Sequence, residues 1–150
     1  MCKDAFEFLI DSEEKYDVIY MRAVFEHIDK DRIIELLRLI NERLTIDGKV
    51  LIEVPNMDWI WASHERYMDF THEVGFTRES LGQVMRNVFV DVQVENTENS
   101  ERFHSIKITL ARKVFGLLLY WSEPVIKPEV FFAKCIMGIG HKNIEERESK

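Results

Sequence analysis

A short polar stretch gathers more side chains capable of chemistry than any other part of the sequence. It holds two imidazoles, a carboxylate, a guanidinium and a phenol, in His64, Arg66, Tyr67, Asp69 and His72. Histidine titrates near neutral pH and is therefore the usual general base. The same groups could equally pin a surface loop, so the stretch supplies candidates rather than an assignment.

Two histidines with acids nearby raise the question of a metal site. The spacing of His64 and His72 matches no common zinc pattern, and no cysteine lies beside them. We therefore expect no metal. The two cysteines, Cys2 and Cys135, lie near opposite ends of the chain, which indicates a reducing compartment without a disulfide framework.

Other polar residues follow apolar runs that are typical of strands. Arg22, Ala23, Glu26 and His27 come after the first such run, and Asn56 comes after the second. Ligands of open α/β sheets bind at the carboxyl ends of the strands, so these residues are candidates for a binding site. Alternatively, Glu26 and His27 cap and orient the next helix, and Asn56 only ends its strand.

Periodicity predicts the elements that must position these residues. Residues 16–21 and 49–55 are short apolar runs that suit buried strands. Between them, residues 33–44 carry an apolar stripe at helical spacing. Asp47 and Gly48 predict a turn in which the glycine takes the left-handed conformation. Strand, helix and strand together predict a right-handed crossover between parallel strands.

The second half of the chain opens with a loop-like stretch at 56–76. Thr77 suits the N-cap of a helix, with Phe76 and Leu81 as a hydrophobic staple around it. Residues 90–95 alternate between valine and polar residues, which predicts a strand with one buried face.

The remaining segment, 106–121, is apolar on most sides of a possible helix. Such a helix is more often buried between neighbours or in an oligomer interface than at a membrane. Basic residues nearby leave peripheral membrane contact as the less favoured interpretation. We expect a single domain divided into a core (1–95), a helical insertion (96–129), a last strand (130–142) and a tail (143–150).

Composition narrows the class of protein further. The net charge of −7 argues against a general nucleic-acid binder. The longest apolar run, 114–121, is far shorter than the roughly 20 residues of a spanning helix. No signal peptide is evident, so we expect a soluble, cytoplasmic protein.

The order of these segments resembles that of a known family. The segments Asp17-Val-Ile-Tyr20, Val24-Phe-Glu-His-Ile28 and Ile52-Glu-Val-Pro-Asn56, with the helix between them, resemble the second half of a class I, Rossmann-like S-adenosylmethionine (SAM)-dependent methyltransferase. Residues 66–72, followed by Phe76-Thr77, resemble the branch that methylates small molecules and glycans. The resemblance implies an α/β fold whose partial sheet has about four strands, mostly parallel with an antiparallel C-terminal strand, flanked by helices.

The resemblance also implies SAM as the cofactor, and contacts to it. Asp4 and Ala5 stand where the family places an acid and a small residue against the adenine. Arg22, Ala23 and His27 lie in the turn that passes beneath the cofactor.

Roles in the reaction follow from the same resemblance. Methyl transfer is an in-line displacement in which most of the catalysis is positioning, and a hydroxyl or amine acceptor benefits from a base. His72 is the preferred base and His64 the second choice, with Asp69 as an orienting partner. Asn56, Arg66 and Tyr67 are the expected contacts to a small-molecule or sugar acceptor.

One departure from the family concerns its glycine-rich cofactor turn. No glycine precedes Gly48, and the motif Gly138-Ile-Gly140 is followed by too few residues for a dinucleotide site. We therefore expect the C-terminal portion of a methyltransferase domain, which holds the cofactor only when an N-terminal half is supplied. The alternative is a non-catalytic interaction or oligomerisation domain.

The strand at 16–21 is paired on both sides in the full fold. Without the N-terminal half it becomes an apolar edge strand, and such edges pair with other chains. We expect self-association through this edge or through 106–121, or binding of a complementary N-terminal half.

Overall fold

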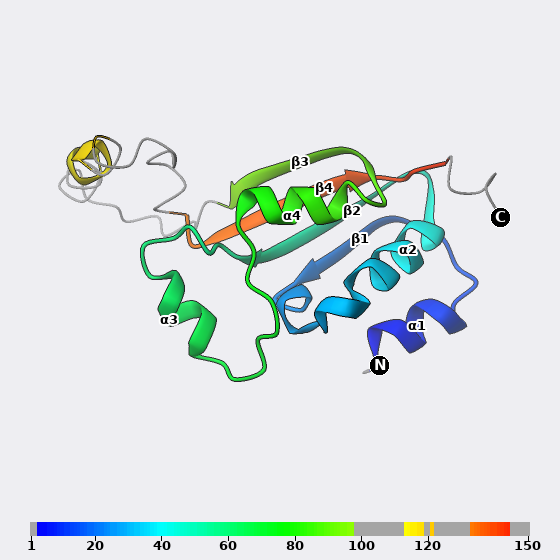
Figure 1. Cartoon of the computed structure of the whole chain (residues 1–150). Coiled ribbons are helices and arrows are strands. Elements are labelled where there is room, and N and C mark those ends of the chain that lie inside the picture. The colour runs from blue at the N-terminus through cyan, green and yellow to red at the C-terminus, as the bar shows by residue number, and fades with distance from the viewer. Residues whose placement is uncertain (1–2, 98–112, 119–120, 122–132, 145–150) are drawn as a thin grey trace, which may run out of the picture.

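The computed structural model of the chain describes residues 3–97, 113–118, 121 and 133–144. Its elements combine helices with a single sheet (Figure 1). In chain order they are α1 (Ala5–Asp11), β1 (Tyr16–Arg22), η1 (Phe25–His27), η2 (Lys30–Arg32), α2 (Ile33–Arg43), β2 (Leu44–Pro55), α3 (Ala62–Tyr67), α4 (Arg78–Met85), β3 (Val90–Thr97) and β4 (Cys135–His141), where η marks a short 3-10 helix.

The strands form one mixed sheet in the order β1-β2-β4-β3. β1 pairs in parallel with β2, while β4 runs antiparallel to both β2 and β3. β1, β2 and β3 therefore point the same way, and the strand that comes last in the sequence lies between β2 and β3. The predicted partial sheet with an antiparallel C-terminal strand is confirmed, as is the parallel crossover through α2.

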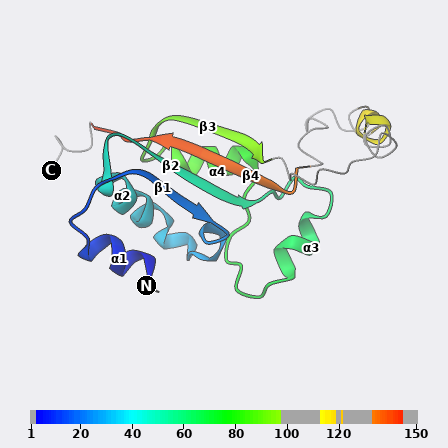
Figure 2. The same ribbon diagram turned by 180° about the vertical axis from the view of Figure 1, so that it is seen from behind.

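Helices α2 and α4 cover the same face of the sheet, as the two opposite views show (Figure 1, Figure 2). Burial alternates along the strands in agreement with this arrangement, because successive side chains point to opposite faces. Val50 and Ile52 are fully buried on the helix-covered face. Leu51, which points to the other face, is only half-buried.

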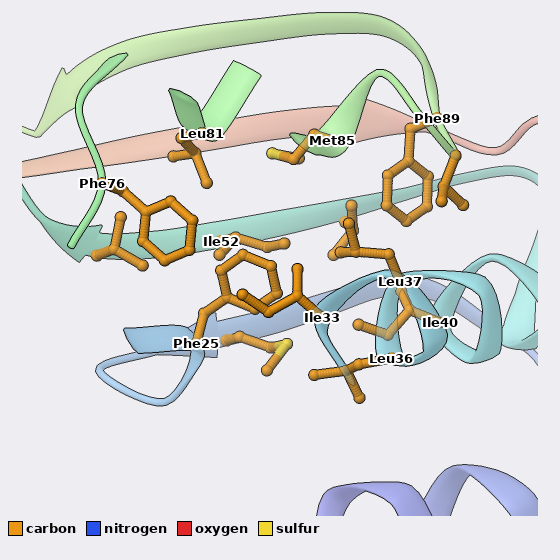
Figure 3. Packing of buried hydrophobic residues seen from close by; sticks show 14 of the residues in the cluster. Phe25, Ile33, Leu36, Leu37, Ile40, Ile52, Phe76, Leu81, Met85 and Phe89 are labelled. Carbon is orange, nitrogen blue, oxygen red and sulfur yellow. The ribbon is translucent and has the colours of Figure 1, made fainter. Parts of the chain in front are cut away.

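The core lies between the helices and the covered face (Figure 3). α2 contributes Leu36, Leu37 and Ile40, each with no exposed surface, which explains the apolar stripe in the sequence. α4 starts as predicted: the Thr77 side chain accepts a hydrogen bond from the backbone N–H of Ser80, whose own side chain accepts from the backbone N–H of Thr77.

The Gly138-Ile-Gly140 motif allows α4 to approach the sheet closely. A Cβ atom at Gly138 would lie 2.3 Å from the sulfur of Met85, and one at Gly140 would lie 2.8 Å from Cβ of Phe89. A side chain at Gly138 would force the end of Met85 to move, and one at Gly140 would force Phe89, just after α4, away from the sheet. The motif is thus part of helix–sheet packing within β4.

The turn predicted at Asp47 and Gly48 is not formed. β2 begins at Leu44 and runs through both residues, and no described glycine has a positive φ. Instead, β2 bulges between its pairings with Tyr16 and Val18. A Cβ at Gly48 would lie 3.0 Å from the Cβ of Leu44 and from backbone atoms of Thr45. The glycine therefore serves close packing inside a bulge.

β3 departs in one place from the predicted alternation. Val92 and Val94 pack against the core, but Val90 is 41% exposed. Asp91 has φ 50°, and the pairing with β4 shifts between Val90 and Gln93. This bulge turns Val90 away from the buried face.

α1 and α3 are two further short helices. α1 matches the amphipathic N-terminal stretch and buries Phe6 and Leu9. α3 lies inside the stretch 56–76, which was expected to be a loop; it buries none of its residues and therefore left no apolar periodicity to read. No described helix is long and apolar enough to cross a membrane.

Only part of the apolar segment 106–121 lies among the described residues. Residues 113–118 are helical, but Leu117, Leu118 and Trp121 are 68%, 61% and 89% exposed. The prediction that the segment is buried within the chain is therefore wrong at these described positions. A contact with another molecule stays a prediction. The rest of the segment, and residues 130–132 of the expected last strand, lie outside the described residues.

β1 forms one edge of the sheet. Its burial pattern is that of a partly exposed strand, so the expectation of a strand buried on both faces is not met within this chain. An apolar groove of about 550 Å³ follows β1 and α1, lined among others by Ala5, Phe8, Val18 and Tyr20. The predicted edge strand is present, and it is apolar.

Candidate functional site

The end of β1 leads into a tight turn that carries two polar residues. Ala23 takes the left-handed conformation with φ 51°, and its N–H donates to the carbonyl of Glu53 on β2. The next residue but one, Phe25, is fully buried and stacks on Phe76 at 5.2 Å between ring centroids. With Phe25 anchored in the core, η1 holds Glu26 and His27 at the carboxyl end of β1.

A loop distant in sequence is bonded to the same turn. The N–H groups of Glu73 and Val74 donate to the carbonyl oxygen of Glu26, at 2.8 and 3.1 Å. Arg66 of α3 donates to the carbonyls of His72 and Glu73, at 2.6 and 3.1 Å. These backbone contacts hold His72 beside η1.

A cavity of about 360 Å³ lies between these segments, at the carboxyl ends of β1 and β2. η1 and the 68–72 segment form further walls, and the start of β4 adds Lys134 and Cys135. The cavity lies at the edge of the sheet where open α/β proteins bind ligands.

Three potential ligand side chains meet in this cavity. Each of Glu26, His27 and His72 offers one atom within 4.8 Å of the atoms offered by the other two. The two imidazole rings are tilted against each other at 4.7 Å between centroids. Glu26 is only 3% exposed, and its Oε2 has no hydrogen-bond partner among the residues that the structure describes. Burial raises the pKa of Glu26, although His27 and His72 favour its charged form.

The ring of His27 is oriented by a chain of hydrogen bonds. Thr71 donates its hydroxyl proton to Asp69 Oδ1 at 2.7 Å, so its oxygen is left to accept from His27 Nδ1 at 2.9 Å. The Thr71 carbonyl lies 3.1 Å from the same nitrogen. The hydrogen bonds from Thr71, helped by His72 and His27, lower the pKa of Asp69 below its ordinary value. With its proton on Nδ1, neutral His27 carries its lone pair on Nε2.

The charges around the cavity are partly balanced by two ion pairs. Arg22 lies 3.6 Å from Glu53, and Lys134 lies 3.3 Å from Glu65. Among the described residues of the cavity lining, both lysine and arginine side chains are therefore matched by acids of the same lining. Glu26 and Asp69 are the acids of the lining outside these two pairs, and the cavity accordingly favours a cation.

The structure brings together five of the predicted site residues and separates the others from the cavity. Those that line the cavity are Arg22, Ala23, His27, Asp69 and His72. Those outside its lining are Asp4, Ala5, Asn56, His64, Arg66 and Tyr67.

The residues outside the lining have other positions. Asp4 caps α1, accepting from the N–H groups of Phe6 and Glu7 at 2.9 and 3.2 Å, and Ala5 lines the apolar groove. Asn56 is fully buried: its amide donates to the carbonyl of Ala133 at 2.9 Å and accepts from the N–H of Asp58 at 3.0 Å.

The other three predicted residues lie on α3. Arg66 binds backbone carbonyls, as described above, and thereby shapes the loop that carries His72. His64 and Tyr67 are exposed to solvent. Within the described residues, the polar cluster of the sequence thus divides into a part that lines the cavity and a part that supports or flanks it.

Sequence reasoning missed several residues of the cavity, notably Glu53, Glu65, Lys134 and Cys135. A signal existed for the last two. An antiparallel strand starts where its parallel neighbours end, so the start of β4 must lie over the carboxyl ends of β1 and β2. Burial raises the pKa of the Cys135 thiol, and the Glu53 carboxylate adds to the effect.

The sequence matches the model of a protein family, and the fold and the position of the cavity agree with that match. Residues 3–91 match the family described as Methyltransferase domain, and since this match spans more than half of the chain, the chain belongs to that family. The sheet and its helices are those of a class I, Rossmann-like methyltransferase domain. No curated protein matched the sequence.

Solved structures show the same fold at low sequence identity. A SAM-dependent methyltransferase from Archaeoglobus fulgidus is 23% identical with a TM-score of 0.69, covering 95% of this chain and 66% of that one. The N-methyltransferase NodS from Bradyrhizobium japonicum, in complex with S-adenosyl-L-homocysteine, is 11% identical with a TM-score of 0.54, covering 93% and 52%. A phosphoethanolamine N-methyltransferase from Haemonchus contortus is 21% identical with a TM-score of 0.54, covering 93% and 36%.

The shares of the solved chains that are covered show how much of each neighbour this chain spans. The chain spans less than two thirds of the length of each of these three solved methyltransferases.

Proposed function

We propose that the chain takes part in SAM-dependent methyl transfer to a small-molecule or sugar acceptor in the cytoplasm, with the acceptor bound in the cavity at the ends of β1 and β2. The observation that carries the proposal is the joining of Glu26, His27 and His72 at that edge of the sheet. Family membership supplies the reaction class.

The described residues fit one side of a SAM site. Ala5 and Arg22, both predicted cofactor contacts, line the same apolar groove, and Arg22 also lines the polar cavity. The carboxylate of Asp4 already caps α1, and no glycine-rich turn precedes Gly48. We propose that the adenine lies along the groove between Ala5 and Val24, and that a second polypeptide segment supplies the remaining contacts.

Bound SAM supplies a methyl group activated by its sulfonium. The part of this chain is to hold the acceptor and to take up its proton. His72 is half-buried and faces the cavity, and it is our proposed base for an acceptor hydroxyl or amine. Asp69 acts on it through the loop, since Thr71 links Asp69 to His27, which lies beside His72.

The partner of the β1 edge belongs to the same proposal. Val18 and Tyr20 expose 48% and 52% of their surface beside an apolar groove. We propose that a complementary N-terminal half of the fold, or a second copy of this chain, covers them. If a partner binds without any cofactor site, the domain serves interaction or oligomerisation alone, which is the alternative function.

Calorimetric titration of the chain with S-adenosylhomocysteine tests the proposal. At concentrations where a second copy of the chain supplies the remaining contacts, we expect micromolar binding, and at least tenfold weaker binding for Ala5→Trp, whose indole fills the groove. Ile10→Trp, on the same helix but outside the groove lining, is the matched control and retains the affinity. Absence of heat up to millimolar ligand, from a chain shown to be folded by circular dichroism, would contradict a site completed by a second copy. It would favour either a fragment that needs its N-terminal half or the interaction domain.

A further inference from the structure

We propose that Glu26, His27 and His72 form a binding site for a divalent ion of the first transition row, with Zn²⁺ as the ion that best fits the donor set. Two imidazoles and one carboxylate are the protein ligands of many catalytic zinc sites and of the facial triads of other transition metals. Mg²⁺ and Ca²⁺ prefer all-oxygen ligands and fit this set poorly.

The first observation is geometric. The three ligand atoms already lie within 4.8 Å of one another, although the residues come from η1 and from a loop more than 40 positions away. Around a tetrahedral zinc ion, ligand atoms lie about 3.4 Å apart. Small side-chain rotations bring groups at the observed separations to that distance, and the half-buried His72 has room to move.

The second observation is the state of Glu26. Its side chain is buried, and within the described part of the chain Oε2 lacks a hydrogen-bond partner. A buried carboxylate oxygen without a partner is costly in a folded protein. A cation bound between this oxygen and the two imidazoles would supply the missing partner.

The third observation concerns His27. Its Nδ1 is held by Thr71, which is itself fixed by Asp69. Histidine ligands of metals are commonly oriented in this way, by an acceptor at the ring nitrogen opposite the ligating one. The arrangement leaves Nε2 of His27 as the nitrogen with a lone pair for the ion.

The charges of the cavity support a cation in this position. Arg22 and Lys134, the arginine and lysine of the described lining, are paired with Glu53 and Glu65. The ion therefore meets an acidic environment, because Arg22 and Lys134 already form ion pairs with other carboxylates. Its open coordination positions face a cavity in which an oxygen of the acceptor would be the natural ligand.

The binding of the ion stands on the geometry alone, whereas its contact with an acceptor rests on the proposed function. In the metal-bound form His72 is a ligand and does not take up a proton. The task of lowering the pKa of an acceptor hydroxyl then passes to the ion.

Calorimetric titration of the metal-free chain with zinc chloride, without cofactor or acceptor, tests the site. We expect one equivalent bound at micromolar or lower Kd. Glu26→Gln, which keeps the shape of the side chain, and His72→Gln should each weaken binding at least tenfold. Thr71→Val, which removes one acceptor at His27 Nδ1 and leaves the carbonyl, should weaken binding less.

Two controls separate this site from adventitious binding. His141→Gln removes an exposed imidazole on β4, away from the cavity, and Cys135→Ser removes the thiol that lines it. Both should retain the wild-type affinity, and circular dichroism of every variant checks its fold. Failure of the wild type to bind zinc up to millimolar concentration would overturn the site. Wild-type affinity for zinc in Glu26→Gln and His72→Gln would overturn it as well. Neither result bears on cofactor binding, which the titration with S-adenosylhomocysteine measures separately.

Discussion

The two faces of the sheet come from the same strands but have different surroundings. On the face covered by α2 and α4, Val50 and Ile52 have no exposed surface. On the opposite face, Val18 and Tyr20 are about half exposed, and Leu51 is only half-buried. The described helices α2 and α4 both lie on the first face (Figure 1, Figure 2). The difference teaches that local sequence specifies apolar strands, while the chain segments and partners around a face decide whether it is sealed.

The largest effect should come from truncating neighbours on one strand that point to opposite faces. Ile52→Ala should lower the free energy of unfolding by about 2–5 kcal/mol because it leaves a cavity in the core. Leu51→Ala, a change of equal chemistry, should cost less than half as much. Urea unfolding of both variants measures the difference. Equal losses would mean that the second face is covered in solution.

A smaller effect is expected at the β1 edge. Val18→Lys places a charge on the exposed apolar edge and should weaken self-association at least tenfold, or about 1.4 kcal/mol. Ile10→Lys adds the same charge on α1, outside the groove lining, and should leave association unchanged. Sedimentation velocity over a concentration series measures both. A wild-type chain that stays monomeric at high concentration would contradict self-association.

The smallest effect concerns a phenol on the open face. Tyr20 donates its hydroxyl hydrogen to Glu53, and this bond raises the pKa of the phenol above its ordinary value of 10.0. The phenolate absorbance of Tyr20, taken as the difference between wild type and Tyr20→Phe, should therefore have its titration midpoint above pH 10.0. In Glu53→Gln the midpoint should fall toward the ordinary value. A midpoint below the ordinary value in the wild type would show that the bond is absent.

The main elements could be predicted because they bury apolar stripes. α2 and the strands leave periods of 3.6 and 2 in the sequence, and the Thr77 cap has a local signature. Gly48 was expected in a turn but lies in a bulge, since a glycine that avoids a clash looks the same in sequence as one that needs positive φ. The register of β3 shifts at Asp91, which has a positive φ although it is not a glycine, so the sequence did not indicate the bulge.

The candidate site was only partly predictable. The carboxyl end of β1 follows from the strand order, so Arg22, Ala23 and His27 could be placed there. The meeting of His27 with His72 depends on hydrogen bonds from Glu73 and Val74 to the backbone of Glu26, which no local pattern encodes. For the same reason, spacing along the chain gave no indication of the cluster that these residues form.

The two glycines of β4 have a consequence for the precision of the cavity. Only Gly138 and Gly140 can lie beneath Met85 and Phe89 without a clash. A slip of β4 by one residue would put Met137 and Ile139 there instead, because neighbouring side chains alternate between faces. The two glycines therefore favour this register of β4 over a register shifted by one residue. Through that alignment, packing at the far end of the sheet fixes where Lys134 and Cys135 come to lie over the site.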